Sequence, residues 1–262
     1  MSAARMNSSN ASSGSRPLNV TVLGSGDAFA TAGRSQSGYL VSVGGTCVLM
    51  DAGPDLLGSM KRKKLAPADL DVIAVSHLHG DHYGGIPFLM LEYLYESRPD
   101  RIIHFVGPRN LESRCWRMMK LAYPRFNVGV IRPWLHFIEI EPHQEVRVGQ
   151  ARISAIRSPH METDISLSLK LRIAGRTIVY SGDSGWNEEL VSFAEGADLF
   201  ICECTYYESS QLTFHMNYPQ LAANRTRFKV KRMLLSHLGR EVLAHKRNLK
   251  MKLAFDGLKI KL

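Results

Sequence analysis

The 262-residue chain has only four cysteines, and their spacing matches neither a disulfide framework nor a structural zinc module. Cys47 and Cys115 are isolated, whereas Cys202 and Cys204 flank Glu203 in a strand-like run and would share one buried face. We therefore expect small core residues at both of these positions. The scarcity of cysteine argues against a disulfide-stabilised secreted protein and favours a reducing, cytoplasmic location.

Long apolar runs are also missing. The longest, such as 72–75 and 199–202, are far shorter than the roughly 20 residues of a membrane-spanning helix. Residues 1–16 are rich in Ser, Asn and Ala and lack the apolar stretch of about 7 to 15 residues that marks a secretory signal. We predict no membrane segment, a disordered tail at residues 1–16, and one domain that covers residues 17–262.

Acidic residues are scarce toward the C-terminal end. The chain has a formal net charge of +9, which favours an anionic partner. Between Ser209 and Lys252, Glu241 is the single acid among ten basic residues: Arg225, Arg227, Lys229, Lys231, Arg232, Arg240, Lys246, Arg247, Lys250 and Lys252. A solvated face on two helices and a surface that draws phosphate-bearing substrates toward a nearby site explain this segment equally well.

The rest of the composition, 45% hydrophobic and 22% charged, is that of an ordinary globular protein. Short β-branched runs predict strands at 19–23, 39–43, 46–51, 72–76, 102–106, 151–157, 166–173, 177–181, 199–202 and 233–236. The pair Gly44-Gly45 predicts a two-residue hairpin turn. Helical patterns occur at 55–63, 86–95, 110–123, 187–194, 218–228 and 241–253. Strands followed by helices in both halves predict an α/β protein (α+β in some schemes) built as a four-layer αββα sandwich.

Three histidines and an aspartate are crowded into His77-Leu78-His79-Gly80-Asp81-His82, directly after the predicted strand at 72–76. Imidazole nitrogen and carboxylate oxygen both bind divalent cations such as zinc. Four potential ligands exceed the needs of one tetrahedral ion if others join from elsewhere, which indicates two ions. A polar loop with incidental histidines is a poor alternative, because so many polar groups behind a buried strand are costly without a partner.

This motif resembles the H-x-H-x-D-H signature of the metallo-β-lactamase superfamily, and further residues agree with it in order along the chain. Asp51 resembles the aspartate that orients the metal loop, and His160, Asp183 and His237 each follow a predicted strand. The resemblance covers the chain after the tail and implies the metallo-β-lactamase αββα sandwich. It implies one ion held by His77, His79 and His160, a second held by Asp81, His82 and His237, and Asp183 as the bridge between them.

The expected cofactors are two divalent metal ions, with Zn2+ as the default and Mn2+ or Fe2+ as alternatives, because mixed nitrogen and oxygen ligation accepts several first-row ions. Such a pair lowers the pKa of a shared water and supplies hydroxide near neutral pH. Asp81 is a candidate to orient that water or to accept its proton.

Other segments resemble the ribonuclease Z-like branch of this superfamily. The opening, 22–26 with 34–40, and the close, 255–258, are similar to that branch. So is the stretch Glu203-Cys204-Thr205-Tyr206 with His215 beyond it. The resemblance implies that His215 is a general acid that assists departure of the leaving oxygen and that Glu203 holds it. Imidazole suits this role because its pKa lies near working pH.

The expected substrate follows from features of ribonuclease Z-like enzymes that this chain lacks. Only 22 residues separate His160 from Asp183, and no Gly-Pro-rich insertion follows, so the projecting arm with which ribonuclease Z grips tRNA is missing. The compact cyclic phosphodiesterase of phosphonate catabolism is similar in size, but the chain lacks its cysteine cluster at 27–34. We therefore favour a phosphodiesterase acting on small cyclic or linear phosphodiesters.

Three alternatives stay open. An RNA endo- or exonuclease of the ribonuclease Z-like type would use the same chemistry, and a basic cover at residues 108–134 would suit it. A lactone or carboxyl ester hydrolase would use the same metals without needing His215, and a non-catalytic module would have lost ligands. The expected partner is an anionic phosphodiester substrate, with nucleic acid as a candidate, and no membrane. A homodimer is a further candidate because dimers are common in the resembled branch.

Overall fold

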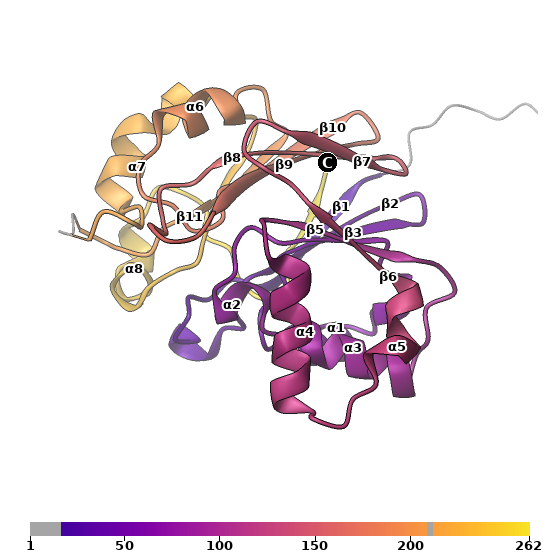
Figure 1. Ribbon diagram of the computed structural model, residues 1–262. Helices are drawn as coiled ribbons and strands as arrows, with labels where there is room; N and C mark the ends of the chain where they lie inside the picture. Colours follow the sequence, from indigo (N-terminus) through magenta and orange to yellow (C-terminus); the bar gives the residue numbers. More distant parts are fainter. Residues whose placement is uncertain (1–16, 209–211) are drawn as a thin grey trace, which may run out of the picture.

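The computed structural model describes residues 17–208 and 212–262, so the tail expected at residues 1–16 lies outside the described residues. Two β-sheets face each other, as Figure 1 shows. The first has the order β13-β1-β2-β3-β4-β5-β6. Its strands are β1 (Asn19–Gly24), β2 (Gly38–Val43), β3 (Thr46–Met50), β4 (Val72–Ala74), β5 (Ile103–Gly107), β6 (Leu135–Glu139) and β13 (Lys259–Lys261).

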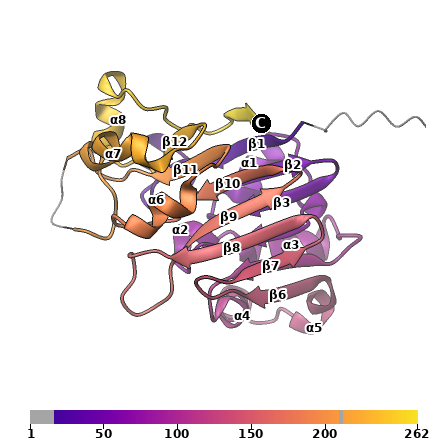
Figure 2. The ribbon, with the colours of Figure 1, turned by 90° about the horizontal axis from the view of Figure 1, so that it is seen from above.

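The second sheet has the order β12-β11-β10-β9-β8-β7. Figure 2 looks down on it and shows these strands side by side. They are β7 (Glu145–Val148), β8 (Ala151–Arg157), β9 (Leu167–Ile173), β10 (Arg176–Tyr180), β11 (Leu199–Glu203) and β12 (Met233–Ser236). Aliphatic side chains from both sheets, such as Val41, Leu169 and Ile201, form the core between them. Burial on both faces explains why β11 and β12 are apolar along most of their length.

Helices cover the outer faces and complete four layers (Figure 1). The first sheet carries α1 (Leu56–Arg62), α3 (Ile86–Tyr95) and α4 (Leu111–Ala122), which bury residues such as Tyr93 and Cys115 against it. Two shorter helices, α2 (Gly80–Tyr83) and α5 (Val128–Ile131), belong to the same half. The second sheet carries α6 (Glu188–Ala194), α7 (Tyr218–Asn224) and α8 (Arg240–Ala244). Asn187 and Asn217 cap α6 and α7 with their side-chain oxygens.

The expected architecture is confirmed, but some elements differ from the prediction. Gly44 and Gly45 have φ values of 58° and 87° and join β2 to β3 as a two-residue turn. The helix predicted at 241–253 is wrong: it ends at Ala244, and the chain then runs alongside β12, where the amide of Leu235 donates to the carbonyl of Lys252. Three strands, β6, β7 and β13, were not predicted from the sequence.

The topology gathers the polar motifs at one end of the sheets. β3 is parallel to β4, and β10 and β12 are both parallel to β11, so the carboxyl ends of these strands lie at common edges. Asp51, His77, Asp183, Glu203 and His237 all occur at the end of one of these strands or within three residues after it. Within the described residues, none of the helices is long and apolar enough to cross a membrane.

Candidate metal centre

The loop after β4 is anchored by Asp51, whose side chain is fully buried. Its carboxylate accepts hydrogen bonds from the amide and hydroxyl of Ser76 at 2.7 and 2.8 Å, and from the hydroxyl of Tyr180 at 2.7 Å. Nδ1 of His82 donates to the same carboxylate at 2.7 Å. Asp51 therefore fixes both the start of the loop and the ring of His82, as the sequence predicted. Tyr180 was missed, because its pattern is that of any core tyrosine at the end of a strand.

Four of the five predicted histidine ligands are oriented in the same way, through Nδ1. His82 donates to Asp51, His160 donates to the carbonyl of Phe214 at 2.9 Å, and His237 donates to Oγ1 of Thr205 at 2.9 Å. Because the hydroxyl of Ser76 donates to Asp51, it accepts from Nδ1 of His77 at 3.1 Å. Each hydrogen bond occupies Nδ1 and turns Nε2 toward the cluster, which is how proteins orient a metal-binding histidine. There Nε2 of His160 lies 3.0 Å from Nδ1 of His79, and Nε2 of His237 lies 3.3 Å from Oδ2 of Asp81.

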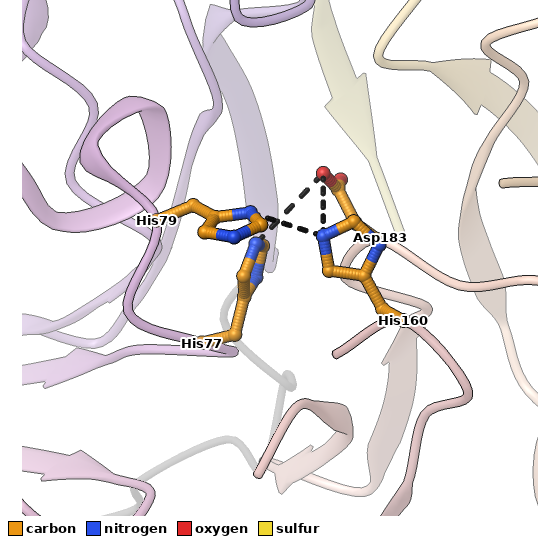
Figure 3. A group of neighbouring side chains, drawn as sticks. All are labelled: His77, His79, His160 and Asp183. Atoms are coloured by element: carbon orange, nitrogen blue, oxygen red, sulfur yellow. Dashed lines mark hydrogen bonds and ion pairs between the residues drawn. The ribbon is translucent and has the colours of Figure 1, made fainter. Parts of the chain in front are cut away.

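The structure brings together all seven predicted ligands in two groups that share Asp183. In each group the potential ligand atoms lie within 4.8 Å of one another. Figure 3 shows the first group, in which Oδ2 of Asp183 lies 3.8 Å from Nε2 of both His77 and His160. The groups are His77, His79, His160 and Asp183, and Asp81, His82, Asp183 and His237.

The second group is equally close. Oδ1 of Asp183 lies 3.2 Å from Nε2 of His82, and its Oδ2 lies 3.4 Å from Nε2 of His237. Oδ2 of Asp81 lies 3.2 and 3.3 Å from the same two nitrogens. Asp183 thus has a carboxylate oxygen within 3.8 Å of Nε2 of four histidines: His77, His82, His160 and His237.

Buried polar atoms without hydrogen bonds test whether these residues fit divalent cations. Nε2 of His77, Nε2 of His82 and Oδ1 of Asp183 are buried and form no hydrogen bond within the described residues. A buried unsatisfied polar group costs about 1–3 kcal/mol, and such groups are rare unless an ion or water satisfies them. Imidazole nitrogens with carboxylate oxygens are donors that zinc and its neighbours accept. The residues therefore fit the metal ions that the sequence implied.

The ionisation of the cluster points the same way. Burial lowers the pKa of His77 well below its ordinary value, and burial also lowers the pKa of His79 and of His160. Burial would raise the pKa of Asp183, but the charges of His237 and His82 outweigh it and hold that pKa well below its usual range. Burial would also lower the pKa of His82 and of His237, but the charge of Asp183 outweighs it and raises both. A cation that bound these two imidazoles would release their protons, whereas His77, His79 and His160 are already neutral.

A second pair lies against the metal cluster. Glu203, almost fully buried, accepts from the amide of Ser184 at 2.8 Å and from Nδ1 of His215 at 2.7 Å. Burial alone would lower the pKa of His215, but the charge and hydrogen bond of Glu203 outweigh it and raise that pKa to about 9. The ring of His215 lies 4.8 Å from that of His160 and 5.5 Å from that of His237. Glu203 therefore keeps His215 protonated beside the cluster.

Thr205 links this pair to the cluster and was not singled out by the sequence. Its hydroxyl donates to Oε2 of Glu203 at 2.9 Å and accepts from His237, so it orients a predicted ligand and the predicted acid together. A cavity of about 620 Å³ adjoins Thr205 and is lined also by Phe29, Tyr206 and Arg240. Cavities of this size accommodate small molecules.

Comparisons with known proteins agree with this geometry. Residues 18–256 match the model of the family described as "Anti-Pycsar protein Apyc1". The chain is 27% identical over 224 residues to the probable metallo-hydrolase YhfI of Bacillus subtilis, which covers 84% of this chain and 87% of that protein. It is 26% identical over 265 residues to ribonuclease Z of Ignicoccus hospitalis, covering 82% of this chain and 86% of the relative.

The solved structures show the fold. The crystal structure of YhfI, a metallo-β-lactamase fold protein from Bacillus subtilis, covers 94% of this chain and 100% of its own length. The TM-score is 0.75 at 23% sequence identity. The predicted metallo-β-lactamase fold is confirmed.

Proposed function

The chain belongs to the family described as anti-Pycsar protein Apyc1, and from this premise and the geometry of the site we propose that it is a phosphodiesterase acting on small cyclic or linear phosphodiesters. It is a metal-dependent hydrolase of phosphoester bonds, in keeping with relatives named metallo-hydrolase and ribonuclease Z. The observation that carries the finer proposal is the pair His215 and Glu203 beside the predicted ligands. Hydrolysis of an alkoxide-leaving phosphodiester needs such an acid, whereas a metal-dependent lactonase does not.

We propose that His77, His79 and His160 hold one divalent ion, that Asp81, His82 and His237 hold a second, and that Asp183 contacts both. Zinc is the proposed metal, with manganese or iron as alternatives that suit the same donors. Bound there, these ions supply Lewis acidity and a water nucleophile that ionises near neutral pH. Asp51, Ser76 and Thr205 would keep the imidazoles in the tautomer that binds metal.

His215 would then protonate the oxygen that leaves the phosphorus. Its Nδ1 is committed to Glu203, so Nε2 is the nitrogen that can give up a proton to substrate. Asp81, whose pKa His237 and His82 lower against the effect of burial, is ionised and can orient the attacking water or accept its proton. The chain thus supplies a base and an acid on residues of opposite charge.

The charge distribution favours a small substrate over RNA. Three of the six basic residues at 108–134 form ion pairs, which weakens their attraction for RNA. Arg109 pairs with Glu141, Arg114 with Asp164, and Arg132 with Glu112. RNA cleavage is the second candidate, favoured by the similarity to ribonuclease Z. A cytoplasmic location stays a prediction, supported by four free cysteines.

A panel of substrates tests the proposal. The panel contains bis(4-nitrophenyl) phosphate, cyclic mononucleotides, linear dinucleotides, a precursor tRNA and a lactone. We expect turnover of the small phosphodiesters and slower or no turnover of the others. Preferential cleavage of the tRNA would favour the ribonuclease, and preferential opening of the lactone would contradict a phosphodiesterase.

The variant His215→Ala tests the proposed acid. We expect turnover of a linear dinucleotide, whose leaving group is an alkoxide, to fall about 100-fold to 1,000-fold, the usual contribution of a general acid, with metal content unchanged. The matched control is His143→Ala, which removes an exposed histidine whose ion pair with Glu189 lies outside the cluster. Equal turnover in His215→Ala and His143→Ala would remove the reason for preferring a phosphodiester substrate.

A further inference from the structure

A second cavity, of about 730 Å³, lies on the side of the molecule where the chain ends. Figure 2 shows the C-terminal end of the chain on the same side as β12. The walls of the cavity come from the start of β11, from residues 230–234 that lead into β12, from residues 250–252, and from residues 258–261 around β13. No residue of the candidate metal centre lines it. We call this cavity the basic groove.

Among the residues that the structure describes, basic side chains line the basic groove and no acidic side chain does. Two of the cations have partners: Lys231 pairs with Asp198 at 2.9 Å, and Arg232 donates to the carbonyl of Lys261 at 2.7 Å. Five exposed cations form no ion pair with any residue that the structure describes: Arg225, Lys250, Lys252, Lys259 and Lys261. Such a cluster repels itself, and a cleft lined by one sign of charge concentrates ions of the other sign.

The floor of the basic groove is apolar. Leu199, Leu234 and Met251 are buried beneath it, and Met233 and Ile260 are half-buried at its sides. Methionine side chains adapt to ligands of irregular shape, and an apolar floor with polar groups at the rim is the usual composition of a small-molecule site. The described part of the chain contributes no aromatic residue to the lining, so it supplies none of the stacking platforms by which single-stranded nucleic acids bind.

Charge complementarity selects the class of occupant. A phosphate monoester carries a charge of about −1.5 to −2, so five unpaired cations match a compound with more than one phosphate group. The chain's own residues 1–16 contain two arginines and no acid, and a second copy of the chain brings a net charge of +9. Neither complements the groove. We propose that the basic groove is a second binding site, for a small compound with several phosphate charges, of the size and amphipathic character of a nucleoside diphosphate.

The experiment measures binding of ADP that carries a fluorescent methylanthraniloyl group on its ribose, by fluorescence anisotropy on the full chain with its metal. The groove variant is Lys252→Glu with Lys259→Glu, and a milder variant has Gln at both positions. The matched control is Lys64→Glu with Arg147→Glu, which makes the same charge change at two exposed basic residues outside the groove. Circular dichroism checks that all variants are folded.

We expect the Kd for the probe to rise at least about 10-fold in the Glu variant, to rise less in the Gln variant, and to stay unchanged in the control. Unlabelled ADP and pyrophosphate should displace the probe, whereas adenosine should not. Turnover of bis(4-nitrophenyl) phosphate should be the same in all variants, which separates this proposal from the proposed catalytic function. Equal Kd values across the variants would overturn the proposal. So would a single-stranded RNA 20-mer that displaces the probe at lower concentration than ADP through the same lysines, because the groove would then be a nucleic-acid surface.

Discussion

The substitution Thr205→Val tests how the metal cluster is held in place. Valine keeps the branched shape of threonine but replaces the hydroxyl by a methyl group, so packing is preserved and two hydrogen bonds are lost. Glu203 keeps its bonds from Ser184, His215 and the amide of residue 205. His237, which is 4% exposed, loses the acceptor of its Nδ1 proton. The loss therefore falls mainly on His237.

Leaving one buried donor unsatisfied costs about 1–3 kcal/mol in the free energy of unfolding. Removing the partner that orients a ligating histidine lowers metal affinity about 10-fold to 100-fold, which is about 1.4–2.8 kcal/mol. The two free energies are of similar size. We therefore expect Thr205→Val to lower both the free energy of unfolding and the metal affinity. Urea denaturation and competitive titration with a metal-binding dye measure them. The control Thr205→Ser keeps the hydroxyl and should restore metal affinity. Wild-type affinity in Thr205→Val would refute the positioning role of this hydroxyl.

Two further predictions concern the same cluster. Asp51→Asn places an amide where four donors converge on a buried carboxylate, and we expect the free energy of unfolding, measured with urea, to fall by about 3–5 kcal/mol. Asn tolerates the φ of 58° at this position, so the substitution should not strain the backbone. An unchanged free energy of unfolding would therefore contradict the expected cost of disturbing these four hydrogen bonds. The pKa of His215, raised from 6.5 to about 9, predicts that kcat falls as pH rises through about 9, because the acid must be protonated. Glu203→Gln should move this fall in the pH profile of kcat toward 6.5, and an unmoved profile would exclude His215 as the titrating acid.

The clustering of the candidate ligands was predictable because their pattern depends on local sequence. An apolar strand followed at once by His77, His79, Asp81 and His82 defines where a polar cluster must lie, and parallel strands bring their carboxyl ends to one edge. The hydroxyls that hold these ligands were not predictable in the same way. Thr205 orients His237, which lies 32 positions away in the sequence, and no local pattern encodes that contact.

The missed strands and the wrong helix have related causes. β7 and β13 are short, and their alternating residues are exposed or half-buried, so they lack the apolar signal of a central strand. The segment after Ala244 has helix-forming residues, but Leu235 donates a backbone hydrogen bond to Lys252 and accepts one from Ala254, and this pairing imposes an extended path. Tertiary pairing overrides local propensity there.

The most direct test of the account is the metal content of the purified chain, measured by inductively coupled plasma mass spectrometry, with Asp183→Ala alongside. The account predicts two divalent ions per wild-type chain, because two donor groups share Asp183, and a loss from both groups in the variant. Protein that is folded and binds no metal even after zinc is supplied would contradict it.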